Sequence, residues 1–157
     1  MAEPTARAFT VVAVAQRTPA WHLARMGRLT ASRAAQMMTT RKGGAEAAGR
    51  RQLRLQLALE RITGHAQESG FLSPAMQQGI DREPDAAKLY EAVTGTLRIH
   101  TVLLANRTLM AGCSLDGHVG DFEGIVEIKA PLAATHWESL VMGRVPEAYQ
   151  TQILHSL

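Results

Sequence analysis

The chain has 157 residues, of which 46% are hydrophobic, and its formal net charge is +3. This length suits one domain with a single core, and no apolar run approaches the roughly 18–20 residues that a membrane span needs. The N-terminus lacks the basic start and long apolar centre of a signal peptide, and the single cysteine, Cys113, excludes an internal disulfide framework, so we expect a cytoplasmic protein without a membrane segment.

Helices are expected throughout the N-terminal part. Pro19 can open a helix in PAWHLARMG, and Thr30 or Ser32 can cap a second helix in TASRAAQMM. A third helix is predicted over 47–62, with Gly64 as its stop signal. The apolar side chains expected on one face of this helix are Leu55, Leu59 and Ile62.

A fourth helix is predicted to begin at Ser73 and Pro74 and to end at Gly95. One of its members, Glu83, is a carboxylate within an apolar stripe, and Pro84 beside it predicts a kink or a fresh helix start. The stripe recurs at steps of four and three residues and consists of Met76, Ile80, Glu83, Ala87 and Tyr90.

The hydrophobic period then changes from that of helices to that of strands. Three strands are predicted over 96–104, 109–113 and 124–130. A helix over 136–142 and a last helix that opens at Pro146 follow them. Helices, then a three-stranded meander, then helices predict a mixed α/β domain in which helices pack on a small sheet.

Three side-chain types outside these patterns receive structural interpretations. Cys113 is expected to be a buried strand residue, since no activating base accompanies it. Trp21 and Trp137 are expected to pack in the core, and His118 is expected in a surface turn. The six histidines show no zinc-binding spacing, and there is no second cysteine, so a zinc site is not expected.

Charge is distributed unevenly along the chain. Residues 1–61 hold eleven basic and three acidic residues, a net charge of +8, whereas residues 62–157 hold six basic and eleven acidic residues, a net charge of −5. An enzyme that acts on nucleic acid needs cations for phosphates and carboxylates for metal. Arginine dominates the basic residues, which suits bidentate phosphate binding, although the composition of a GC-rich genome explains the same preference.

Two charged residues, Glu127 and Lys129, fall within the third predicted strand. Residues two apart share one face of a strand, and Asp116 reaches the same face if the second and third strands pair. Two carboxylates and the Ile128 carbonyl would supply hard oxygen ligands for Mg²⁺, and Lys129 would orient a water or stabilise charge on a phosphate. The competing interpretation is an ordinary Glu–Lys pair on a solvated hairpin.

This arrangement resembles the PD-(D/E)XK nuclease signature, and the whole chain from about Gln16 resembles the phage lambda exonuclease and YqaJ-type viral recombinase family. The segments that carry the resemblance are WHLARMGRLTAS at 21–32, ERITG at 60–64, MQQGIDREPDAAKLYEAVTG at 76–95, CSLDGHVG at 113–120, EIKAP at 127–131 and YQTQ at 149–152. The resemblance implies a restriction-endonuclease-like α/β core in a single nuclease domain over 1–157, which lacks the family's C-terminal strand and helix.

Roles follow from the resemblance position by position. Asp116 and Glu127 resemble the metal ligands, and Lys129 resembles the catalytic lysine. Glu83 matches a helix glutamate beside the metal site, and Gln152 matches a glutamine that supports the site from the last helix. The residues that match the family's 5′-phosphate contacts are Arg25 and Ser32.

The resemblance also implies an activity and an assembly. The expected protein is a Mg²⁺-dependent exonuclease, with Mn²⁺ as a substitute metal, that degrades linear double-stranded DNA from 5′ to 3′. It would form a homotrimer and work with a single-strand annealing protein. Two alternatives stay open, namely another nuclease of the same core, such as an endonuclease or repair nuclease, and a non-catalytic DNA-binding remnant left by truncation.

Overall fold

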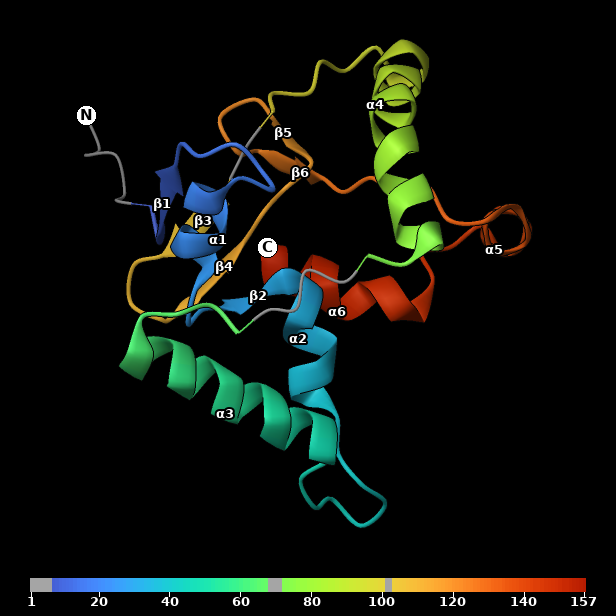
Figure 1. Cartoon of the computed structure of the whole chain (residues 1–157). Coiled ribbons are helices and arrows are strands. Elements are labelled where there is room, and N and C mark those ends of the chain that lie inside the picture. Colours follow the sequence, from blue (N-terminus) through green and yellow to red (C-terminus); the bar gives the residue numbers. More distant parts are fainter. Residues whose placement is uncertain (1–6, 68–71, 101–102) are drawn as a thin grey trace, which may run out of the picture.

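The computed structural model describes residues 7–67, 72–100 and 103–157, which form six helices and six strands (Figure 1). The helices are α1 (Pro19–Arg25), α2 (Ala31–Met38), α3 (Ala48–Thr63), α4 (Pro74–Thr94), α5 (Ala133–Met142) and α6 (Glu147–Ser156). The strands are β1 (Phe9–Val12), β2 (Leu29–Thr30), β3 (Leu103–Asn106), β4 (Ala111–Cys113), β5 (Gly117–Val119) and β6 (Gly124–Val126). No helix in this described part is both long and apolar enough to cross a membrane.

Four of the strands form one mixed sheet in the order β1-β3-β4-β2. β3 pairs antiparallel with β1 and with β4, whereas β2 joins β4 in parallel. β5 and β6 form a separate antiparallel hairpin. A bridge between Ile99 and His118, with N···O distances of 2.8 and 2.9 Å, ties this hairpin to the segment that leads into β3. The expected mixed α/β class is confirmed.

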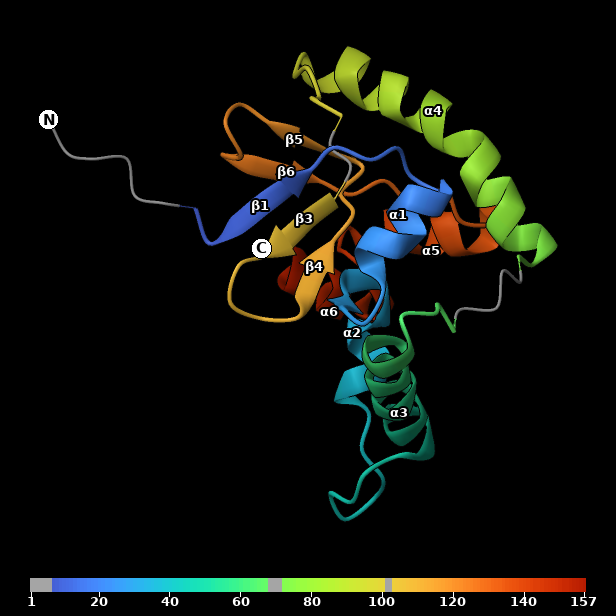
Figure 2. The same cartoon turned by 60° about the vertical axis from the view of Figure 1, so that its left-hand side comes forward.

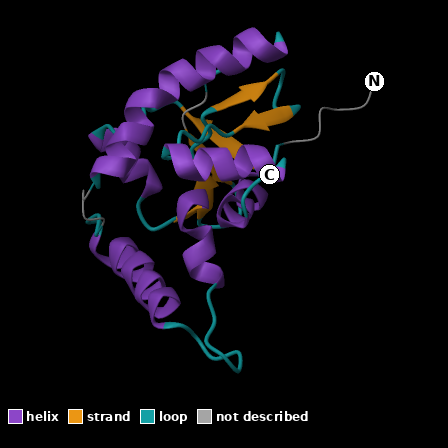
Figure 3. Cartoon of the chain, turned by 90° about the vertical axis from the view of Figure 1, so that its right-hand side faces the viewer, coloured by secondary structure: helices purple, strands orange, loops and turns teal. Residues whose placement is uncertain are grey.

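The helices flank the strands rather than enclose them (Figure 3). α2 packs against both α6 and α3, and α2 and α6 also contact β4. α3 and α4 lie at opposite ends of the molecule, and α4 runs past the β5–β6 hairpin (Figure 2). The hairpin thus faces α4 on one side of the fold, and the candidate site residues are found on this side.

The core lies where α2 meets the sheet. A buried cluster of Ala31, Leu104, Cys113 and Leu115 is packed against Phe9, Phe122 and Ile125. Cys113 is buried in β4, as expected, and burial raises the pKa of its thiol to about 11. Since β3, β4 and α2 all contribute to this cluster, burial of their apolar side chains fixes the position of the segment that follows β4.

The predicted helix ends are confirmed where a capping residue marks them. Thr18 precedes Pro19, and its hydroxyl accepts a hydrogen bond from the Trp21 N–H at 3.3 Å. The Ser73 hydroxyl caps α4 in the same way, and a glycine in the left-handed conformation ends α3 and α4. Thr30 is the N-terminal cap of α2, but its hydroxyl makes no capping hydrogen bond. α4 continues through Pro84, so the fresh start expected there is wrong.

The predicted strand bounds need correction. β3 begins at Leu103 instead of residue 96, and the third predicted strand ends at Val126, before Glu127. Residues 101–102 of the first predicted strand lie outside the described residues. β1, β2 and β5 were not predicted, because each is a stretch of two to four residues whose strand pairing depends on partners far along the chain.

The predicted apolar face of α3 is wrong. Leu55, Leu59 and Ile62 are exposed, Ile62 by 83%, and the buried positions are Leu53, Leu57 and Glu60. α3 carries leucines on two faces, so periodicity alone does not decide between them, and packing against α2 selects the face. Trp137 is exposed rather than in the core, and His118 is buried in β5 against the Phe122 ring rather than in a surface turn.

Candidate active site

Asp116 and Glu127 are brought together by the β5–β6 hairpin. Gly117 pairs with Val126 in this hairpin, so the residues immediately outside the pair are Asp116 and Glu127. The Ile128 N–H donates to the Asp116 Oδ2 atom at 2.6 Å, which joins the two segments beyond the last strand pair. Asp116 and Glu127 therefore lie close together, as expected. The pairing of β5 with β6 brings them together, whereas the second and third predicted strands do not pair.

We call Asp116, Glu127 and Glu83 the carboxylate cluster, and Glu127 lies at its centre. Its Oε1 atom accepts hydrogen bonds from the Lys129 Nζ and from the Gln152 Nε2. Glu127 and Lys129 lie in an extended segment after β6 instead of within a strand, yet their side chains meet as predicted. Gln152 lies on α6, and α6 also packs against α2. The hairpin and the last helix thus both hold Glu127.

Glu83 approaches the cluster from the middle of α4. Its Oε2 atom accepts a hydrogen bond from the Arg17 Nη2 at 3.1 Å. Glu83 also lies near enough to Asp116 to act on it electrostatically. Glu83 thus lies toward the hairpin, although Ala87 is the one member of the predicted stripe that is buried and Met76 is exposed. Arg17 was missed in the sequence analysis, because its position before α1 belongs to no periodic pattern.

The pKa of Asp116 is raised from its ordinary value of 3.8 to about 6. Burial is the largest cause, since the residue is only 9% exposed and desolvation penalises its charged form. Repulsion from Glu127 and Glu83 adds to the rise, whereas the hydrogen bond from Ile128 and the charge of Lys129 oppose it. Burial and the two neighbouring carboxylates thus outweigh Lys129 and the Ile128 hydrogen bond in their effect on Asp116.

The donor set fits a magnesium ion. The described residues contain no group of three or more His, Cys, Asp or Glu side chains that could hold a metal. Asp116 and Glu127 supply carboxylate oxygens, and the Ile128 carbonyl would complete a smaller set of hard oxygen donors. Mg²⁺ accepts such a set, because it usually keeps several of its water ligands.

Arg25 and Ser32 lie together at the junction of α1 and α2. The Arg25 guanidinium stacks over the Trp21 ring at 3.9 Å, and its Nη2 lies 3.5 Å from the Thr30 hydroxyl. That hydroxyl is 3.4 Å from the Ser32 hydroxyl. The Trp21 Nε1 donates to the Ser114 hydroxyl at 2.9 Å, two residues before Asp116. Trp21 thus links this polar junction to the carboxylate cluster.

A sequence model of the YqaJ-like viral recombinase domain matches residues 20–157. This chain belongs to the YqaJ-like family. A solved alkaline exonuclease, LHK-Exo from Laribacter hongkongensis, is 36% identical with a TM-score of 0.73 over 86% of this chain and 64% of its own. LHK-Exo in complex with dAMP gives 36% identity and a TM-score of 0.75 over 88% and 67%. The search of curated proteins found no match.

The resemblance noted in the sequence is thereby confirmed, and the YqaJ-like domain shares the fold of these exonucleases. It spans about two thirds of the length of the solved relatives. The exonuclease identity and the complex with dAMP belong to those relatives.

Two side chains of α3 hold the turn between α1 and α2 of the YqaJ-like domain, a contact that was not predicted from the sequence. The Glu60 Oε2 accepts from the Gly27 N–H at 2.8 Å, and the Arg61 Nε donates to the Gly27 carbonyl at 2.6 Å. Glu60 is 2% exposed, and its Oε1 also accepts from the Gln67 N–H. Two adjacent residues of α3 thus clamp both backbone groups of one glycine, which lies two residues after Arg25.

Replacing Glu60 by alanine should lower the free energy of unfolding by about 3 kcal/mol, since it leaves two backbone N–H groups without their carboxylate acceptor. Glu60→Gln should cost less, because one acceptor oxygen remains. Denaturant titration measures both changes. Glu46→Ala is the matched control, because its carboxylate makes an exposed ion pair with Arg54, and it should change stability by well under about 1 kcal/mol.

Proposed function

We propose that this chain is the catalytic domain of a metal-dependent DNA exonuclease of phage-type recombination. The convergence of Asp116, Glu127 and Lys129, which lie beside one another after β4 and β6, carries the proposal. Membership of the YqaJ-like family and the likeness to solved alkaline exonucleases support the exonuclease assignment.

Asp116, Glu127 and the Ile128 carbonyl would hold the metal, Mg²⁺ or Mn²⁺. When bound there, the ion would supply a Lewis acid for a phosphate oxygen and would offset the negative charge of the carboxylates. Gln152 holds the Glu127 Oε1 atom from α6 and so keeps this ligand in place. Glu83 lies beside the ligand set and adds to its negative field.

Lys129 would act on the water and the phosphate. Glu127 holds the Lys129 amine by one ion pair, and the side chain remains about one-third exposed. An ammonium has three donors, so the other two are available to orient the attacking water and to stabilise charge that develops on the phosphate in the transition state. The substrate would be linear double-stranded DNA, degraded from 5′ to 3′.

The polarity follows from a 5′-phosphate site at Arg25 and Ser32. Arg25→Ala should reduce the preference for a 5′-phosphorylated end over a 5′-hydroxyl end by at least about tenfold, because a charge-assisted contact is lost. Initial rates on duplexes that differ only in this end group measure the preference. The hydroxyl-ended duplex is the internal control, and its rate should change little. An unchanged preference would remove Arg25 from the phosphate site.

The proposed exonuclease activity is tested with closed circular and linear duplexes of the same sequence. Mg²⁺-dependent release of nucleotides from the linear form alone is the expected result, because the enzyme needs an end. Cleavage of the closed circle would instead identify an endonuclease. DNA binding that is salt-sensitive, without nucleotide release in Mg²⁺ or Mn²⁺, would support the non-catalytic alternative.

The same family membership supports proposals about assembly and place of action. The active form would be a homotrimer, its partner would be a single-strand annealing protein, and it would act in the cytoplasm of a bacterial or phage-infected cell. Light scattering of the purified chain gives its oligomeric mass. A monomeric mass under conditions in which the chain degrades DNA would contradict the trimer.

A further inference from the structure

Arg17 has an unusual backbone conformation for its residue type. Its φ angle is +64°, in the left-handed region that glycine adopts without strain and that side chains with a Cβ atom disfavour. Among the described non-glycine residues only Phe122 shares a positive φ. Residues in such conformations persist where the surrounding structure holds them, and they concentrate at functional sites. The choice of arginine rather than glycine at position 17 therefore needs an explanation.

The residues on both sides of Arg17 hold its backbone. The Gln16 Nε2 donates to the Leu115 carbonyl at 3.2 Å, one residue before Asp116. The Thr18 hydroxyl donates to the Ala15 carbonyl at 2.7 Å and caps α1. The strained conformation is thus fixed between the start of α1 and the segment that carries a predicted metal ligand.

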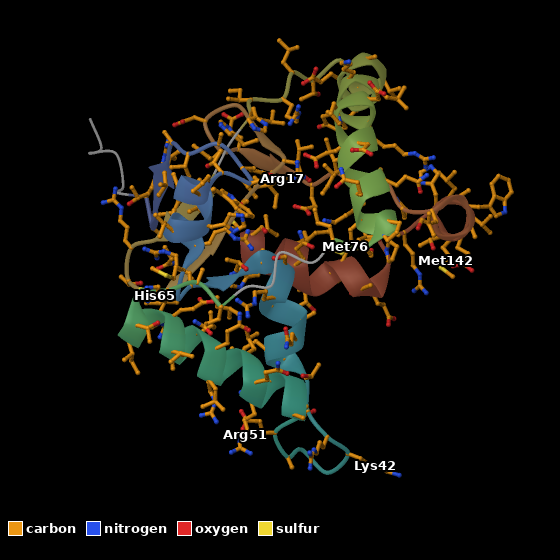
Figure 4. The ribbon with its side chains drawn as sticks, in the orientation of Figure 1. Arg17, Lys42, Arg51, His65, Met76 and Met142 are labelled. Atoms are coloured by element: carbon orange, nitrogen blue, oxygen red, sulfur yellow. The ribbon has the colours of Figure 1, made fainter. Side chains whose placement is uncertain are left out.

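This conformation directs the guanidinium to the carboxylate cluster. In Figure 4, Arg17 lies between the strands and α4, and its Nη2 is 3.1 Å from the Glu83 Oε2. The Arg17 side chain is 49% exposed. A guanidinium has five N–H donors in a planar fork, so the ion pair leaves further donors facing solvent beside the carboxylates.

The ion pair alone does not account for the strain. Half-exposed ion pairs contribute little to folding, because water screens them, so a pair with Glu83 would not offset an unfavourable φ. Cations beside carboxylates are useful where a polyanion must approach, because Asp116, Glu127 and Glu83 repel DNA phosphates. Arginine suits phosphate because its fork binds two oxygens.

We propose that Arg17 is a phosphate-binding residue of this site: Glu83 orients its guanidinium, and the exposed edge of the fork binds a backbone phosphate of the DNA strand that enters the carboxylate cluster. The inference rests on the proposed function for the identity of the ligand. It adds a third cation to Lys129 and Arg25, the two cations already proposed to act on the DNA phosphates.

Two variants test the proposal. Arg17→Gly removes the guanidinium and fits the backbone, because glycine adopts a φ of +64° without strain. Arg17→Lys keeps the charge but loses the fork. Anisotropy of a labelled linear duplex in EDTA gives the affinity over a range of NaCl concentrations, and steady-state cleavage in Mg²⁺ gives kcat and KM. Arg107→Ala is the control, because this exposed arginine donates to the Phe9 carbonyl from the β3–β4 turn.

Arg17→Gly should weaken DNA binding and raise KM by about tenfold, with kcat changed less than about twofold. The slope of log affinity against log salt should fall by about 1, because one phosphate contact is lost. Arg17→Lys should retain that slope and recover only part of the affinity. The thermal midpoint of Arg17→Gly should stay level or rise, and Arg107→Ala should behave as the parent chain.

Unchanged affinity and salt slope in Arg17→Gly would overturn the proposal. So would a fall in its thermal midpoint that Arg17→Lys restores without restoring DNA affinity, since that pattern describes a purely structural ion pair. Absence of cleavage by the parent chain in Mg²⁺ and Mn²⁺ would contradict the proposed exonuclease activity instead. The binding comparison in EDTA would still decide the role of Arg17, because it needs no catalysis.

Discussion

Replacing Asp116 by asparagine should abolish the cleavage of linear DNA and stabilise the metal-free protein. The first effect follows from the loss of a carboxylate ligand for the proposed metal. The second follows from the position of Asp116, which is 9% exposed and is repelled by Glu127 and Glu83. Asparagine keeps an oxygen that can accept the hydrogen bond from the Ile128 N–H, and it brings no buried charge.

The stabilisation should depend on pH. The pKa of Asp116 is about 6 in the folded chain against an ordinary 3.8, so the folded state binds this proton more tightly than the unfolded state. The resulting stabilisation is complete below about pH 4 and is lost as pH rises through about 6. At pH 8 Asp116→Asn should therefore be more stable than the parent by about 3 kcal/mol, and the difference should vanish below about pH 4.

Denaturant titrations in EDTA between pH 4 and pH 8 measure this difference. The exposed Asp81 of α4 provides the control, because Asp81→Asn should leave both stability and cleavage nearly unchanged. Adding Mg²⁺ should raise the thermal midpoint of the parent chain and have less effect on Asp116→Asn. A variant that is less stable than the parent at pH 8 in EDTA would contradict the electrostatic description of the site.

Replacing Lys129 by methionine should lower kcat by about a thousandfold, because the variant loses the cation that orients the water and stabilises the phosphate charge. Methionine keeps most of the aliphatic stem, so packing beside the Tyr149 ring should persist. DNA affinity in EDTA should fall by less than about tenfold, since Lys129 is one of several cations in the basic chain. Single-turnover cleavage and anisotropy measure the two quantities separately.

Lys88→Met is the matched control for this experiment. Lys88 makes an exposed ion pair with Asp85 on α4, at 3.4 Å, so it has the same chemistry without the site. Its kcat should equal that of the parent chain. A Lys129→Met variant that cleaves as fast as Lys88→Met would exclude the lysine from the chemical step and would leave only the carboxylates in the proposed mechanism.

The parts of the fold that could be predicted from the sequence carry local signals. Pro19, Ser73, Gly64 and Gly95 mark helix ends, because the chemistry of a cap or a left-handed glycine belongs to a few neighbouring residues. The motif residues Asp116, Glu127, Lys129 and Gln152 meet as the family resemblance implies. Their roles stay predictions until the variants are measured.

The features that could not be predicted depend on distant partners. β5, the hairpin partner of β6, is a three-residue strand inside a stretch that was predicted as a turn. The proximity of Asp116 and Glu127 was therefore predicted correctly, but the strand pairing that produces it was not. The buried face of α3 depends on α2, and the clamp on Gly27 joins residues more than thirty positions apart. Arg17 is found only through its backbone angle and its contact with Glu83.

The buried thiol of Cys113 has a practical consequence for the study of this domain. It is the only cysteine in the sequence, and it lies in β4, three residues before Asp116. Alkylating reagents attack the thiolate, which is scarce at neutral pH when the pKa is about 11, and they must first reach the sulfur. The rate at which Cys113 of the native protein is alkylated therefore reports how often the four-stranded sheet opens, and no cysteine has to be introduced. Metal or DNA that closes the neighbouring site should slow it.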